Sequence, residues 1–172
     1  MQMIADAAEL SVGKIYLHFE GKQAIFDETF AHHESLLRRR MEDSCGDFED
    51  PLALIRCRIR AATKYIGENV EFLRFYRRDA ATGDLIARHG EEHERHFDEL
   101  TNLLREGIRR GLIEDGDPEM LAAMIEGAVH HMMLLVLERE DKSFDEVPEY
   151  LDRYLLAPLE SGRAKSTLED EG

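Results

Sequence analysis

Three histidines occur at helical spacing in this chain. His89, His93 and His96 follow one another at intervals of four and three residues, which places them on one face of a predicted helix. Imidazoles at such spacing can bind zinc, nickel or iron. The surrounding segment, RHGEEHERHFDEL, is so charged that a solvated helix face explains it without a metal. We predict no metal and no other cofactor, and a helical His/Glu metal-binding protein remains an alternative.

Residue patterns that would indicate an enzyme are missing from the sequence. It contains no activated nucleophile, phosphate-binding glycine loop or dinucleotide fingerprint, so we predict that the protein is not an enzyme. Its two cysteines, Cys45 and Cys57, have neither CxxC nor zinc spacing. We therefore expect both to be ordinary thiols of a reducing cytoplasm.

Residues 4–26, IADAAELSVGKIYLHFEGKQAIF, combine polar and basic groups with a helical pattern. Ser11 is a good N-cap for a short second helix, and the two short helices around it predict a helix-turn-helix. In that arrangement Ile15 and Phe19 anchor the second helix from behind. The side chains left facing outward include Lys14 and His18.

The order and spacing of these residues resemble the DNA-binding head of the tetracycline-repressor (TetR) family. The shared features are Ile-Ala, a turn, Ser, Gly two residues on, Tyr, His-Phe, a short loop and Lys. The resemblance implies groove or base contacts from Val12, Gly13 and Lys14, and phosphate contacts from Ser11, Tyr16, His18 and Lys22. Gly13 also has a physical reason, since a missing side chain lets the backbone approach DNA closely.

The chain departs from the family pattern at three points. Glu9 occupies a turn position where Gly is usual, which costs strain if that position needs a positive φ. Leu17 stands where a polar residue is common. The family's first helix would occupy about twenty residues before Met1, and without it we expect Ile4, Ala8, Ile15 and Phe19 to be exposed.

Helical patterns continue through the rest of the chain, and no alternating segment is long enough to predict a sheet. We predict an all-α fold, with a partial head at residues 1–30, a helical ligand-binding and dimerisation body at 31–163 and a flexible tail at 164–172. The predicted body helices run from Lys22 to about Asp43, Pro51 to Gly67, Asn69 to about His89 with an interruption near Thr82-Gly83, Glu91 to Arg110, Pro118 to about Arg139, and Ser143 to about Ser161.

The body carries apolar surface for two expected functions. As in the TetR family, the last two long helices would form a four-helix dimer interface, for which we predict Ala123, Gly127, Met132, Tyr150, Tyr154 and Leu155. The aromatic and methionine side chains of the body suggest a pocket for a hydrophobic or aromatic effector. Its predicted residues are Tyr65, Phe72, Phe75, Tyr76, Phe97, Met124 and His130.

Charge is distributed unevenly between the two regions. Residues 1–40 carry five basic and six acidic side chains, a net charge of −1, which leaves −14 of the total of −15 on the rest of the chain. Such a protein can touch DNA with its near-neutral end. The longest uninterrupted apolar run, Met132 to Leu137, is far shorter than the ~20 residues that cross a bilayer, so we expect no membrane association.

These features predict a cytoplasmic, homodimeric transcriptional regulator. We expect it to act as a repressor that binds double-stranded operator DNA and is released by a small-molecule effector. The alternative is a truncated sensor or heterodimerisation module without DNA binding.

Overall fold

The computed structural model describes residues 1–46, 48–80 and 84–161, with the side chains of 78–80 and 84–93 outside the description. All regular elements in these ranges are helical, which confirms the all-α prediction. They are α1 (Gln2–Ala7), α2 (Val12–Tyr16), α3 (Lys22–Ser44), α4 (Pro51–Glu68), α5 (Val70–Ala80), α6 (Asp84–Arg109), α7 (Pro118–Glu138), α8 (Glu146–Leu151), the π-helix η1 (Asp152–Leu156) and the 3₁₀ turn η2 (Ala157–Leu159).

Side-chain caps explain where several helices begin. The Ser11 hydroxyl accepts a hydrogen bond from the Lys14 amide at 3.2 Å and so caps α2 as predicted. Asp50 and Asp117 cap α4 and α7, and each is followed by a proline at the first helical position, where no amide is needed. Gly111 follows α6 with φ 69°, the left-handed conformation expected of a glycine after a helix.

Two predicted boundaries were wrong. The helix expected to begin at Glu91 begins at Asp84 and runs on through Gly90, since a glycine inside a helix costs only about 1 kcal/mol relative to alanine. The last helix begins at Glu146, not at Ser143. The Ser143 hydroxyl instead accepts from the Asp145 amide, a local turn that holds this segment out of the helix.

The chain divides into two compact units, Met1–Arg39 and Arg40–Gly172. The first unit buries Ala5 and Ile15, which are 0% and 4% exposed, together with Phe26 and Phe30 of α3. The expectation that Ile15 would be exposed was therefore wrong, because residues of this unit already cover it. Ile4 is 37% exposed and Ala8 is exposed, as expected, while Phe19 is half-buried.

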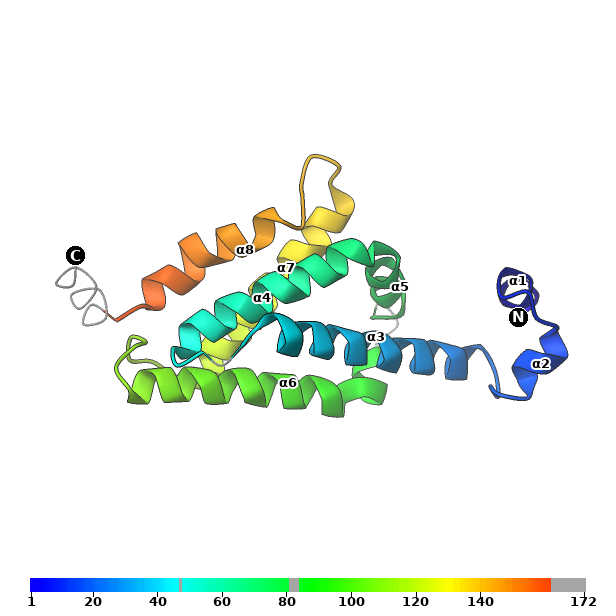
Figure 1. The fold of residues 1–172 in the computed structure, drawn as a ribbon, viewed down its shortest axis with the longest axis horizontal. Helices are drawn as coiled ribbons and strands as arrows, with labels where there is room; N and C mark the ends of the chain where they lie inside the picture. Colours follow the sequence, from blue (N-terminus) through cyan, green and yellow to red (C-terminus); the bar gives the residue numbers. More distant parts are fainter. Residues whose placement is uncertain (47, 81–83, 162–172) are drawn as a thin grey trace. The chain divides into compact units, whose positions relative to one another are not determined.

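The second unit is a helical bundle with one apolar core. α6 packs against α4 and α7, and α8 packs against α4 and α7 (Figure 1). The most deeply buried side chains come from all of these helices and include Leu52, Ile55, Leu104, Ile125 and Leu151. Removing such large apolar surfaces from water is the main force that holds the bundle together.

Arg56 ties α4 to the C-terminal segment of this bundle. Its guanidinium lies 2.5 Å from an Asp152 carboxylate oxygen and 2.6 Å from one of Glu160. Burial opposes its charge, but the hydrogen bonds and charges of Asp152 and Glu160 outweigh this effect and raise the pKa of Arg56 above its ordinary value. An isolated antiparallel bridge between Ile113 and Glu160 fixes the same segment to the α6–α7 loop.

Cys45 and Cys57 form a disulfide in the structure, with their Cα atoms 5.8 Å apart. This corrects the expectation of two free thiols. Cys45 directly follows α3 and Cys57 lies in the second turn of α4, so the start of α4 lies beside the end of α3. The separation of 12 residues matches no local motif, and the packing of the two helix ends creates the pair.

Candidate nucleic-acid interface and body pocket

The helix predicted to recognise DNA is the short α2, which one buried side chain anchors to the rest of the head. Ile15 is 4% exposed, whereas the flanking residues on the other side of the helix face solvent. Six of the seven predicted DNA-contacting residues are exposed, namely Ser11, Gly13, Lys14, Tyr16, His18 and Lys22. Val12, the seventh, is half-buried. The predicted contact residues therefore gather on an open surface that includes a hydroxyl, an amine, a phenol and an imidazole.

A side chain at Gly13 would have almost no contacts with the described part of the chain. A Cβ built on Gly13 would meet only the Ser11 hydroxyl oxygen, 4.0 Å away. Glycine in a helix is unfavourable relative to alanine by about 1 kcal/mol. A glycine with nothing against it is consistent with close approach by a molecule from outside.

Glu9 adopts φ 55° in the turn between α1 and α2. The backbone is left-handed at this position, which is the condition under which a side chain in place of the family glycine is expected to cause strain. A residue with a side chain is strained there, since Cβ crowds the backbone. Glu9 also adds a carboxylate to the turn that precedes the basic Lys14.

The comparisons with known proteins agree with this geometry. Residues 1–29 match the family model described as bacterial regulatory proteins, tetR family. The head of this chain is therefore similar to that of TetR-family regulators. A solved structure of the TetR family transcriptional regulator PfmR from Thermus thermophilus matches over 91% of this chain and 86% of that chain, with a TM-score of 0.76 and 21% sequence identity. No curated protein matches the sequence.

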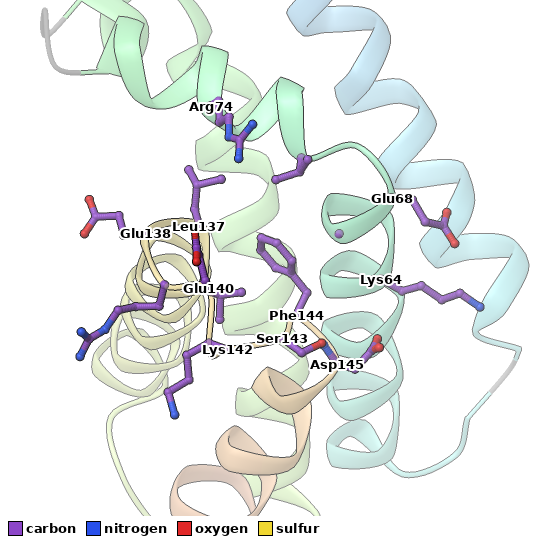
Figure 2. Close-up of a pocket in the computed structure, with 14 residues that line it drawn as sticks. Lys64, Glu68, Arg74, Leu137, Glu138, Glu140, Lys142, Ser143, Phe144 and Asp145 are labelled. Carbon is purple, nitrogen blue, oxygen red and sulfur yellow. The ribbon is translucent and has the colours of Figure 1, made fainter.

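A pocket of about 660 Å³ opens in the body between α4, the start of α5, the end of α7 and the α7–α8 loop. Figure 2 shows the Phe144 ring between the end of α7 and α4, with Leu137 and Arg74 on its open side. The full lining consists of Lys64, Gly67, Glu68, Val70, Arg74, Val136, Leu137, Glu138, Arg139, Glu140, Lys142, Ser143, Phe144 and Asp145. An aromatic and aliphatic floor with a charged rim suits a ligand that has both apolar and polar parts.

The residues predicted to form a pocket lie elsewhere in the body. None of them lines the cavity described above. Tyr65 and Phe72 are buried, and Phe97 packs against the main core. Phe75 and Met124 are 42% and 53% exposed. The rings of Tyr76 and His130 meet edge to face, with centroids 6.1 Å apart.

The lining residues of this pocket carry only a weak signal in the sequence. The charged run from Glu138 to Lys142 indicates no more than the end of a helix. The structure explains one glycine of the lining. A Cβ on Gly67 would stand 3.2 Å from the Phe144 Cβ, so a larger residue there would press against the Phe144 side chain. Close packing of Phe144 on this glycine fixes the floor of the pocket.

Apolar side chains remain exposed on α7, which is the longest apolar helix of the body among the described residues. Met120, Met124 and Leu135 are 64%, 53% and 48% exposed. Of the predicted interface residues, Ala123 is exposed and a Cβ on Gly127 would meet only open space. Met132 and Leu155 pack against the core of the same chain, whereas Tyr150 and Tyr154 stack on one another at the surface, 5.8 Å apart.

α7 also satisfies the length and composition of a membrane span. Its best 18-residue window has a mean hydropathy of 1.7, and 11% of that window is buried in the chain. The uninterrupted run from Met132 to Leu137 alone underestimates the apolar length of this helix. A helix that packs both on a core and on a partner has the same composition, so this feature is weak grounds for a membrane.

The described residues contain no group of three or more His, Cys, Asp or Glu side chains placed to hold a metal ion. His96 is exposed on α6. The side chains of His89 and His93 lie outside the described residues. On α3, burial and then the charge of the neighbouring His32 lower the pKa of His33 below its ordinary value.

Proposed function

We propose that this protein is a cytoplasmic transcriptional repressor that binds double-stranded operator DNA as a homodimer and is released by a small effector. The observation that carries the proposal is the family head at residues 1–29, with its contact residues exposed around α2. Val12, Gly13 and Lys14 face the major groove in this proposal. Ser11, Tyr16, His18 and Lys22 contact phosphates, and such contacts set the register of a protein on DNA.

A homodimer is supported by the unpartnered surface of α7. Met120, Met124 and Leu135 expose about half or more of their surface in the single chain. Large apolar side chains gathered on one helix are typical of an interface with another protein. A second copy of the same helix, together with Tyr150 and Tyr154, would bury them and give the two heads a fixed separation.

The effector site proposed here is the pocket floored by Phe144. Its volume of about 660 Å³ is within the range that holds drug-sized molecules. Val70, Val136 and Leu137 supply apolar contacts, which fits the hydrophobic or aromatic effector expected from the sequence. Arg74 and Lys142 on the rim would select a molecule that also carries a polar or anionic group.

Release follows from linkage between the two sites. A ligand that binds more tightly to the form whose heads are wrongly spaced for the operator must weaken DNA binding by the same factor. Loss of the base and phosphate contacts of one head removes several kcal/mol of binding free energy, which is enough to free the operator.

The test is retardation of a DNA fragment from the protein's own promoter region by the protein expressed from the full reading frame of its gene. We expect a sharp dependence on salt, because neutralised phosphates release counterions. Lys14→Ala and Tyr16→Ala should each weaken binding by roughly tenfold, the equivalent of about 1.4 kcal/mol.

Arg105→Ala is the matched control, since it removes a basic side chain from an exposed position on α6, in the body and outside the pocket lining. It should leave retardation unchanged. Equal retardation by wild type and both head variants would show that α2 is not the recognition surface.

A further inference from the structure

We propose that Cys45 and Cys57 form a reversible oxidation site, a dithiol that closes to a disulfide and staples the end of α3 to α4. The two residues are the only cysteines of the chain. Their Cα atoms are 5.8 Å apart, inside the narrow range that a disulfide requires. The fold therefore holds two thiols in bonding geometry without further movement of the backbone.

Reversibility follows from the compartment. TetR-family regulators are generally cytoplasmic, and in that compartment small thiols and thioredoxins keep most cysteines reduced. A cysteine pair prearranged in such a protein is oxidised only when the redox balance changes. Cys45 is 9% exposed and Cys57 is half-buried, so the more open Cys57 is the sulfur that a small molecule reaches first.

The chemistry is thiol–disulfide exchange with a low-molecular-weight disulfide, RSSR. The Cys57 thiolate attacks one sulfur of RSSR, which forms a mixed disulfide and releases RS⁻. The Cys45 thiolate then attacks Cys57 Sγ, which forms the Cys45–Cys57 bond and releases the second RS⁻. The two thiol protons pass to the two RS⁻ groups. The pair loses two electrons and RSSR gains them, so two RSH molecules leave.

The disulfide joins the C-terminal end of α3 to α4. α3 begins in the first compact unit, at Lys22, and ends at Ser44 in the second. Cys57 is the neighbour of Arg56, which ties α4 to Asp152 and Glu160. Oxidation thus fixes the body end of the helix that leads to the head onto the helix that is already clamped to the C-terminal segment. Reduction leaves that end held by non-covalent contacts alone.

The direct test uses the full chain, equilibrated in buffers with a graded ratio of oxidised to reduced glutathione and then alkylated with iodoacetamide. We expect intact mass spectrometry to find two labels in reducing buffer and none in oxidising buffer, with little singly labelled chain between. The midpoint of thermal unfolding should rise by roughly 5–10 °C on oxidation, since a closed loop of this length restricts the unfolded chain.

Hydrogen exchange provides a second measurement of the closed form. The amides in the last turn of α3 should exchange at least threefold more slowly in the oxidised chain. Cys45→Ser/Cys57→Ser is the matched control, and its melting temperature and exchange should be the same in both buffers. The idea is overturned if both thiols stay labelled in oxidising buffer, or if oxidation yields only covalent dimers or glutathione adducts.

The consequence for DNA rests on the proposed function and is measured separately. Retardation of the promoter fragment should differ at least threefold in apparent Kd between the oxidised and reduced protein, and the double serine variant should show no difference. Equal retardation in both states overturns control of the head while the labelling result stands. Retardation in neither state counts against the proposed function, and labelling still decides the oxidation site.

Discussion

Glu9 is the one described residue other than glycine that has a positive φ. With φ 55° it occupies the left-handed region, which glycine enters freely and a glutamate does not. The strain is local to the turn between α1 and α2, and the contacts that bury Ala5 and Ile15 on either side hold the turn in place.

Replacement of this residue by glycine should stabilise the protein. We expect Glu9→Gly to raise the free energy of unfolding by roughly 0.5–1 kcal/mol, because relief of the Cβ clash exceeds the extra entropy of the unfolded glycine. Urea denaturation followed by circular dichroism measures the change. Glu20→Gly is the control, because this exposed glutamate has no positive φ, and the substitution should give no gain. A gain of equal size in both variants would contradict the strain argument.

At the scale of elements, the end of α6 depends on one close contact between a glycine and a core side chain. Gly107 lies near the end of α6, and a Cβ built there would clash with the Cδ1 atom of Ile113. Ile113 is 2% exposed and belongs to the main core. The glycine allows the chain to turn after α6 and bring this isoleucine back against the same helix.

Gly107→Ala should therefore destabilise the body even though alanine favours helices. The expected loss is about 1–2 kcal/mol, the cost of overpacking reduced by the gain in helix propensity. Gly13→Ala is the comparison, since Gly13 has open space around it and the same substitution should leave the stability unchanged or raise it. Thermal unfolding of the two variants side by side measures the difference, and a neutral Gly107→Ala would show that Ile113 can move aside.

The clamp formed by Arg56 is a second element-scale contact. It joins α4 to η1 and to Glu160 through two carboxylates, and 22% of the Arg56 side chain is exposed. Because it is half-sheltered from water, this network contributes more than an ordinary surface ion pair. A lysine cannot reach both carboxylates with the same geometry.

Arg56→Ala should lower the free energy of unfolding by about 1–3 kcal/mol. Arg58→Ala removes a neighbouring ion pair, to Glu99 at 3.3 Å, and should cost less than about 1 kcal/mol because both partners are more exposed. Equal losses from the two variants in urea denaturation would mean that the Arg56 network is no more than a surface pair.

At the scale of the whole molecule, the exposed side of α7 is the feature that a single chain leaves unexplained. Ala122 and Ile125 face the core at 0% and 2% exposure, while Met120 and Met124 on the opposite side are mostly exposed. A helix that is apolar all round but buried on one side has a second surface available for a partner.

Met124→Lys should convert the proposed homodimer to a monomer of 19.8 kDa, because it places a charge on the exposed apolar side of α7 that the proposed interface buries. Sedimentation equilibrium over a range of concentrations measures the association. Leu17→Lys makes the same change at a side chain that is 80% exposed in the head, and it should leave the dimer intact. A wild-type protein that remains monomeric at all concentrations would rule out this interface.

Local chemistry determined much of this protein from the sequence alone. Ser11, Asp50 and Asp117 act as helix caps through atoms two or three residues away, so the starts of α2, α4 and α7 could be predicted correctly. The head could be identified for the same reason, since its contact residues all lie within residues 4–26. Even the positive φ of Glu9 followed from a position where glycine is usual.

Only the tertiary structure decided which distant residues meet. Cys45 and Cys57 become a pair because α4 turns back along the end of α3, and no spacing rule contains that turn. The pocket draws its lining from α4, α5, the end of α7 and the α7–α8 loop, so the aromatic and methionine content of the sequence could not predict its polar rim. Similarly, helical spacing identifies an apolar face, but packing decides that Met132 faces the core and Met124 faces outward.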